Sequence, residues 1–266
     1  MATIVSFHAH PDDESIGTGG TLAKAAAEGH RVVVVVATRG EHGEAPDGLL
    51  DEGEELAERR VKETNEAAQI LGVHRLEFLD YVDSGIMGAP TNDAARSFWR
   101  VDVDEAADRV AAILVDERAD ILTVYDARGV TGHPDHIQVH RVGTRAATRA
   151  GTVRVYEVTV NRDHVRALME RSATIGLSPP DGIDLQSLGV PAAEVTTTID
   201  VSEFLSAKRR AMAAHASQVS ETSVFLALPE PMFALLWGNE WFIARGNGPI
   251  REGTLFGGMG HTGPVC

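Results

Sequence analysis

The sequence predicts an α/β fold of the Rossmann-like type, in which a mostly parallel sheet is flanked by helices. Apolar runs alternate with amphipathic segments over much of the 266 residues. The stretch Arg31 to Thr38 contains five consecutive valines, which is typical of a strand buried on both faces. A helical pattern from Thr21 to Glu28 separates this strand from the apolar run Ile4 to Phe7. A strand-helix-strand unit of this kind implies a right-handed crossover and parallel strands.

The alternation continues through the middle of the chain. The pattern predicts a helix over about 53–71 ended by Gly72, a strand over 75–79, a polar loop over 83–100, a helix over 104–117, a strand over 120–125, a helix over 134–150 and a strand over 153–160. Pro134 suits the first turn of its helix, because the N–H group that proline lacks would have no helical partner there.

The pattern weakens towards the C-terminus. Glycines and prolines over 171–189 predict a loop or lid, and alternation over 194–199 predicts a strand. Ser202 is expected to cap a helix to about residue 215, and 240–244 to form the last strand. The glycine-rich tail over about 246–266 is expected to be irregular or disordered. We expect a single domain over 1–266 with its core over about 3–220.

Composition and charge narrow the class of protein. The length suffices for one large α/β domain with a well-buried core. With 39 acidic residues against 24 Lys and Arg, the net charge of -15 disfavours nucleic acid and anionic membranes as partners and favours a small-molecule substrate. The sequence leaves a homo-oligomer open. It shows neither a signal-peptide pattern nor an apolar run long enough to span a membrane, so we expect a cytoplasmic location.

Two clusters of histidine and carboxylate residues carry the chemistry. His8-Ala9-His10-Pro11-Asp12-Asp13-Glu14 follows the first apolar run, and His133-Pro134-Asp135-His136 follows the run Ile121 to Tyr125. Parallel strands end at the same edge of a sheet, so we expect both clusters at one site on the C-terminal edge of the strands. Because the only cysteine is the last residue, Cys266, a metal ion there must be held by His and carboxylate side chains.

The spacing within the first cluster indicates metal binding and proton transfer. His10 and Asp13 stand three residues apart across a turn, so both can point at one ion while Asp12 projects differently and stays free. One histidine of the second cluster would complete the three protein ligands of a catalytic zinc site, which leaves a position for water. Zinc lowers the pKa of such a water to about 7, and Asp12 is the candidate base for its proton.

Spacing alone leaves open which histidine of the second cluster binds the metal. One of His133 and His136 can be the ligand, while the other, as a cation, stabilises the oxyanion and protonates the leaving amine. Asp135 could orient this second histidine and raise its pKa by favouring its charged form. His8 lies on the same strand face as His10 and is expected to pack rather than to bind metal.

A nucleotide-binding or metal-binding module without catalysis is the competing class. Gly17-Thr18-Gly19-Gly20 opens a helix after a strand, but it lacks the Gly-x-Gly-x-x-Gly spacing, and no carboxylate ends the second strand. Glycines that allow a helix to pack closely on the sheet explain this stretch better.

Together the two clusters resemble the LmbE-like or PIG-L family of N-acetylglucosamine deacetylases, which includes the mycothiol-pathway deacetylase and the mycothiol conjugate amidase. Further agreement comes from Thr38-Arg39-Gly40-Glu41, Asp83-Ser84-Gly85-Ile86-Met87 and His215-Ala216-Ser217-Gln218, and the resemblance spans about residues 3–220. It implies a zinc-dependent hydrolase of linear amide bonds, and Fe2+ is compatible with the same ligands.

The resemblance also implies a role for each site residue. Three positions match the family's metal ligands: His10, Asp13 and His136. Asp12 matches its general base, and His133 matches the residue that stabilises the oxyanion and protonates the amine, with Asp135 tuning it. Three further positions are expected to bind the substrate: Arg60, Asp83 and Glu41.

One departure from the family concerns catalysis and substrate. Two residues before His133 the mycothiol-pathway deacetylase has a tyrosine that assists catalysis, and this chain has Thr131 there. The favoured substrate is an N-acetylglucosamine-type glycoconjugate, which would give acetate and a free amino sugar. A thiol conjugate of the mycothiol type or an antibiotic intermediate is the alternative amide.

Overall fold

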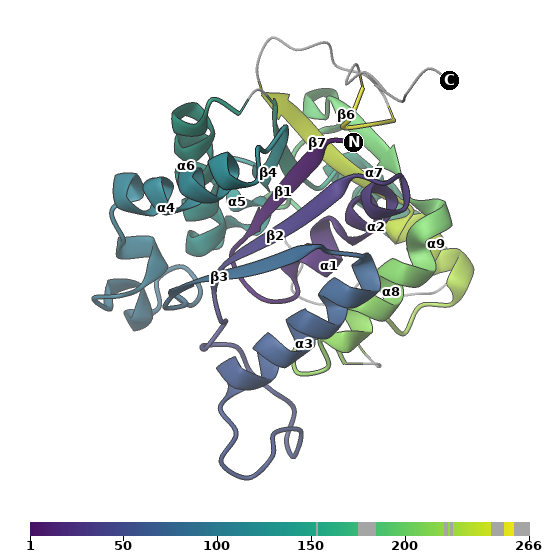
Figure 1. Cartoon of the computed structure of the whole chain (residues 1–266). Helices are drawn as coiled ribbons and strands as arrows, with labels where there is room; N and C mark the ends of the chain where they lie inside the picture. The colour runs from purple at the N-terminus through teal and green to yellow at the C-terminus, as the bar shows by residue number, and fades with distance from the viewer. Residues whose placement is uncertain (153, 175–184, 221–222, 224–225, 246–252, 258–266) are drawn as a thin grey trace.

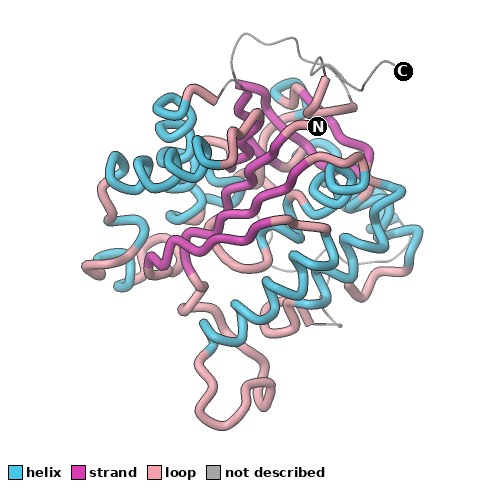
Figure 2. The backbone as a smooth tube through the Cα atoms, viewed as in Figure 1, coloured by secondary structure: helices cyan, strands magenta, loops and turns pink. Residues whose placement is uncertain are grey.

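A seven-stranded sheet with the order β3-β2-β1-β4-β5-β7-β6 runs through the centre of the computed structural model (Figures 1 and 2). The structure describes residues 1–152, 154–174, 185–220, 223, 226–245 and 253–257. The strands are β1 (Thr3–His8), β2 (Arg31–Thr38), β3 (Arg75–Tyr81), β4 (Ile121–Tyr125), β5 (Arg154–Thr159), β6 (Thr197–Asp200) and β7 (Asn239–Arg245).

Most of the sheet is parallel. β1 pairs with β2 and β4, β2 also pairs with β3, and β4 also pairs with β5, all in parallel. β7 lies antiparallel between β5 and β6. The predicted α/β fold with a mostly parallel sheet is therefore confirmed.

Helices cover both faces of this sheet. In Figure 1, α4 and α6 pack together on one face, and α2, α3 and α8 pack together on the other. The α-helices are α1 (Asp13–Gly17), α2 (Gly19–Ala27), α3 (Leu56–Leu71), α4 (Val103–Asp116), α5 (Gly129–Gly132), α6 (Pro134–Ala150), α7 (Arg162–Thr174), α8 (Leu205–Ala214) and α9 (Glu230–Trp237). The 3₁₀ turns are η1 (Pro90–Asp93), η2 (Phe98–Arg100), η3 (Ala192–Glu194) and η4 (Ser202–Phe204).

Among the described residues, no helix combines the length and the apolarity that crossing a membrane would need.

Local signals in the sequence explain where these elements lie. The valines of β2 are fully buried, as expected for a strand covered by helices on both faces. α3 ends at Gly72, whose φ of 73° is a left-handed conformation that suits glycine. The Asp102 side chain caps α4 by accepting the N–H groups of Asp104 and Glu105. α6 begins at Pro134, as predicted.

The strand order reverses between β1 and β4. From β1 the chain adds β2 and β3 on one side, and it then returns to place β4 on the other side of β1. In sheets of this kind, ligands bind outside the carboxyl ends of the strands at the point of reversal. The first histidine cluster follows β1 and the second follows β4, so the fold brings both clusters to this point.

The structure corrects several predictions for the C-terminal half. The segment predicted as a loop from Arg171 begins inside α7, a helix that the sequence pattern does not predict. Ser202 does not cap the next helix, because it starts the 3₁₀ turn η4 and α8 begins at Leu205. The sequence pattern also misses α9, whose eight residues are too few to show helical periodicity. Residues 253–257 of the tail form no helix or strand, and the rest of the tail lies outside the described residues.

Two glycines allow helices to approach their neighbours closely. A Cβ atom on Gly20 of α2 would lie 2.4 Å from Cβ of Val201, and one on Gly143 of α6 would lie 2.3 Å from Cγ1 of Val124 in β4. Both separations are shorter than non-bonded carbon atoms can approach, so one of the two elements would have to move. Close packing therefore accounts for Gly20, in line with the expectation for the Gly17–Gly20 stretch.

We predict that Gly143→Ala destabilises the protein by about 1–3 kcal/mol, because α6 must move away from Val124 to admit the new methyl group. Chemical unfolding measures the change. Thr148→Ala, on the exposed side of the same helix, is the matched control. Equal stability of the two variants would contradict the close packing of α6 on β4.

Candidate metal and catalytic site

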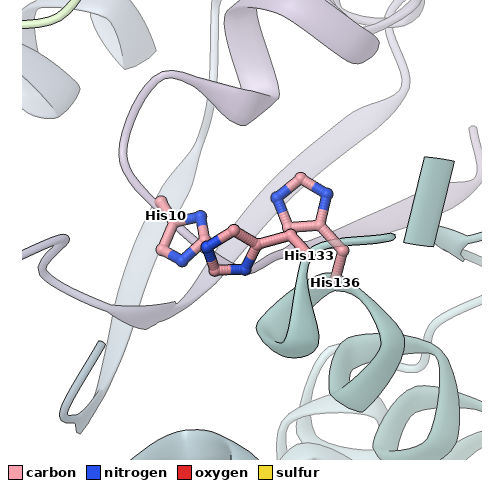
Figure 3. Close-up of side chains that lie close together, drawn as sticks. All are labelled: His10, His133 and His136. Atoms are coloured by element: carbon pink, nitrogen blue, oxygen red, sulfur yellow. The ribbon is translucent and has the colours of Figure 1, made fainter. Parts of the chain in front are cut away.

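Three histidine side chains gather where β1 and β4 end (Figure 3). His10 follows β1, His133 precedes α6, and His136 lies in the first turn of α6. Ring nitrogens of the three lie within 4.8 Å of one another. His10 is buried, whereas the other two are partly exposed, so the cluster is open to solvent on the α6 side.

The Asp13 carboxylate lies between two of these histidines. Its Oδ2 is 3.4 Å from Nδ1 of His10 and 3.4 Å from Nε2 of His136. Ligand atoms at 2.0–2.1 Å from a tetrahedral zinc ion stand about 3.3 Å apart, so both separations fit one ion. Burial opposes the charge on Asp13, but the imidazoles of His136 and His10 hold its pKa well below the usual range. Two imidazoles and one carboxylate are donors that suit zinc or ferrous iron.

The Asp135 carboxylate orients His10. Its Oδ2 lies 3.2 Å from Nε2 of His10 and accepts the backbone N–H of Ser84 at 2.9 Å, and its Oδ1 accepts the Ser84 hydroxyl. With Nε2 held by a carboxylate, Nδ1 of His10 faces Asp13, an arrangement typical of metal-binding histidines. The sequence-based expectation instead pairs Asp135 with His133, which in this structure receives only the backbone N–H of Asp135 among the hydrogen bonds described between these two residues.

His133 has a defined tautomer when it is neutral. Its Nδ1 accepts the Asp135 N–H at 3.2 Å, so the ring proton of the neutral form is on Nε2. Burial and the charges of His10 and His136 lower the pKa of His133 to about 4. The carboxylate of Asp135 acts in the opposite direction without outweighing them. His133 therefore rests as a neutral N–H donor.

Asp12 provides a carboxylate beside the cluster. Its side chain is 17% exposed, and its Oδ2 lies 3.5 Å from Nη2 of Arg60. Burial raises the pKa of Asp12 to about 6, although the Arg60 charge opposes this shift. A carboxyl group with a pKa in this range can accept a proton and release it again near neutral pH.

Arg60, Asp83 and Glu41, the three residues expected to bind substrate, lie next to the cluster and form hydrogen bonds with backbone groups there. Arg60 is buried and donates to two backbone carbonyl groups of neighbouring loops. Asp83 accepts two backbone N–H groups and lies 3.6 Å from Nε2 of His10. Glu41 accepts the Asp83 backbone N–H at 3.1 Å. Each of the three side chains therefore already has hydrogen-bond partners within the protein, with Asp83 beside His10 and Arg60 beside Asp12.

Sequence reasoning gives no role to Tyr125, the last residue of β4. Its ring stacks on His136 with centroids 4.2 Å apart and an angle of 12° between the planes. Its hydroxyl contacts Nδ1 of His8 at 3.2 Å, and His8 is fully buried, in line with its expected packing role. In the sequence Tyr125 is only the last residue of an apolar run, so its contact with His136 cannot be predicted from the sequence.

The fold and the site define the class of the protein: a Rossmann-like α/β protein with a cluster of His and Asp side chains that could hold a metal ion. The chain belongs to the PIG-L family, since the family model described as GlcNAc-PI de-N-acetylase matches residues 5–147. The predicted family and the predicted deacetylase class of enzyme are confirmed.

Relatives match nearly the whole chain. The 1D-myo-inositol 2-acetamido-2-deoxy-alpha-D-glucopyranoside deacetylase of Nocardiopsis dassonvillei is 41% identical over 88% of this chain and 91% of its own length. The protein of the same name from Acidothermus cellulolyticus is 39% identical over 97% and 96%. The structure of N,N'-diacetylchitobiose deacetylase from Pyrococcus horikoshii matches with a TM-score of 0.59 and 22% identity, over 91% of this chain and 83% of that one. This last likeness supports the fold alone.

Asp135→Asn should weaken metal binding about 10- to 100-fold, because the amide has one acceptor oxygen where the carboxylate uses both, and it lacks the negative charge that faces His10. Competition for Zn2+ with a chelating dye measures the affinity. Asp93→Asn is the control, since that side chain is 86% exposed. Unchanged affinity in both variants would show that Asp135 does not orient His10.

Proposed function

We propose that the protein removes the acetyl group from an N-acetylglucosamine joined to myo-inositol, which releases acetate and a free amino sugar. The observation that carries the proposal is the arrangement of His10, Asp13 and His136, with the Asp12 carboxylate beside it. Relatives that match nearly the whole chain are named as deacetylases of such a substrate. Their names favour an acetylated sugar over a thiol conjugate or an antibiotic intermediate.

We assign the metal ligands to Nδ1 of His10, Oδ2 of Asp13 and Nε2 of His136. A zinc ion held by these donors would lower the pKa of a water molecule to about 7 and polarise the amide carbonyl. Ferrous iron fits the same donors. A set of three histidines is the rival assignment, because nitrogens of His10, His133 and His136 also lie close together.

In the proposed mechanism, Asp12 accepts the proton of the attacking water. The Nε2–H of neutral His133 donates a hydrogen bond to the developing oxyanion. Protonation of the leaving amine, which the family resemblance gives to His133, is better supplied by Asp12. Its pKa of about 6 allows it to return the proton, whereas the pKa of His133, about 4, leaves that imidazole neutral at neutral pH, so it donates a hydrogen bond but does not act as the acid.

Arg60, Asp83 and Glu41 remain our proposed contacts for the sugar hydroxyl groups. Their support is their position, since Asp83 lies beside His10 and Arg60 lies beside Asp12. Arg60 is buried, and its Nε has no hydrogen-bond partner among the described residues.

Substitutions at three positions should separate metal binding from catalysis. His136→Ala is expected to lose the bound metal, measured by elemental analysis of the purified protein. Asp12→Ala and His133→Ala should keep about one equivalent of metal but lose at least 100-fold in turnover, since each removes a group that acts on the reacting atoms. Loss of metal from His133→Ala with retention in His136→Ala would reverse the assignment.

The substrate is tested by acetate release. We expect the highest kcat/KM with N-acetylglucosamine linked to myo-inositol, lower values with free N-acetylglucosamine and N,N'-diacetylchitobiose, and the lowest with a cysteinyl-glucosamine amide. Remote binding energy from the inositol is what raises the rate with the full substrate. A preference for the cysteinyl amide would identify a thiol-conjugate amidase and refute the proposed substrate.

A further inference from the structure

The backbone of Asp12 adopts a conformation that is unfavourable for a residue with a side chain. Its φ is 98° and its ψ is -31°. Non-glycine residues rarely have positive φ, because Cβ then crowds the backbone. Such a conformation persists only where the surrounding structure holds it in place, and it recurs at functional sites.

Hydrogen bonds on both sides of Asp12 hold this conformation. The Asp12 N–H donates to Oε2 of Glu14 at 3.1 Å. The Asp12 carbonyl accepts the N–H groups of Ser15 and Ile16, each at 3.0 Å. Of these three hydrogen bonds, only the one to Glu14 involves a side chain. The Asp12 backbone therefore depends on what holds the Glu14 side chain in place.

Glu14 is held by a histidine from the far end of the chain. Its Oε1 lies 2.7 Å from Nε2 of His215, the residue that follows α8, and it also accepts the Ser15 hydroxyl at 2.6 Å. Glu14 and His215 are both fully buried. A buried carboxylate needs such a partner, because without one it pays the full penalty of lost hydration.

The turn that carries His215 is braced by α3. Glu63 of α3 accepts the backbone N–H of Ser217 at 2.9 Å and its hydroxyl at 2.6 Å. Arg60, one turn earlier on α3, donates to the carbonyl of Pro11, the residue before Asp12. α3 therefore fixes His215 and the Asp12 backbone relative to each other.

We propose that the buried pair of Glu14 and His215 positions the Asp12 carboxylate for catalysis by holding the Asp12 backbone in its unfavourable conformation. This inference rests on the proposed role of Asp12 as the base. Glu14 and His215 are too deeply buried to meet a substrate, so they act through Asp12 and are positioning residues. Without the Nε2–H of His215, the Glu14 carboxylate keeps only the Ser15 hydroxyl and the Asp12 N–H as partners, and the Asp12 N–H loses a fixed acceptor.

The test compares His215→Met with His215→Gln, two side chains of similar volume. The Gln amide can donate to Glu14 near the position of Nε2, whereas Met cannot donate. We expect His215→Met to lower kcat about 10- to 100-fold with KM and metal content unchanged, as misplacement of a catalytic group does. His215→Gln should recover kcat to within a few-fold of wild type. His30→Ala, which alters a buried histidine near the N-terminus, is the control and should leave kcat unchanged.

A double substitution separates positioning from general damage. If His215 acts through Asp12, adding His215→Met to Asp12→Ala should cause no further loss of turnover. The proposal would be overturned if His215→Met lowered the turnover of Asp12→Ala by the same factor as it lowers that of the wild type, or if the Met and Gln variants had equal kcat values. If His215→Met does not yield folded protein, His215→Asn replaces it, because its amide is one methylene too short to reach Glu14. Full turnover by Asp12→Ala would instead refute the base assignment itself, so the two failures are distinguishable.

Discussion

The Asp13 carboxylate lies 3.4 Å from a ring nitrogen of His10, which follows β1, and 3.4 Å from a ring nitrogen of His136, which follows β4. The geometry of the site depends on these two contacts. This geometry exists because β1 and β4 are neighbours at the point where the sheet reverses. Burying a carboxylate there is unfavourable unless positive charge compensates it. A divalent cation bound by these three side chains, as we propose, would supply that charge and would also activate water for amide hydrolysis. A cation at this position would therefore both stabilise the buried Asp13 carboxylate and serve the reaction.

Each of the proposed metal ligands, and the proposed base Asp12, is held by a different part of the fold. Asp135 of α6 and the backbone of Ser84 fix His10, and the ring of Tyr125 packs flat on His136. α3 and the turn after α8 fix the Asp12 backbone through Arg60 and the Glu14–His215 pair. Helices from both faces of the sheet thus converge on the site, which explains why residues distant in sequence bear on one reaction.

The sequence predicts much of the fold and the cluster itself. Five consecutive valines and the two His-Pro-Asp motifs are local signals with a physical meaning, and the sheet topology carries them to one edge. The contacts around the cluster are not predictable in this way. The Asp135 carboxylate turns to His10 rather than to its neighbour His133, which follows from the position of Ser84 in space. α9 is missed because its eight residues are almost all apolar and show no period, and α7 because few apolar residues stand among its charged ones. Ser202 lies in a 3₁₀ turn where a cap is expected.

The central claim is that one metal ion is bound by His10, Asp13 and His136. A crystal structure of the metal-loaded protein, with anomalous diffraction data at the zinc edge, tests it most directly. We expect a single strong peak within bonding distance of Nδ1 of His10, Oδ2 of Asp13 and Nε2 of His136, with Asp12 unligated. A peak bound by His133, or by Nε2 of His10 together with Asp83 and Asp135, would contradict it. Among the described residues, His10 with His133 and His136, and His10 with Asp83 and Asp135, are the two sets whose ligand atoms all lie within 4.8 Å of one another.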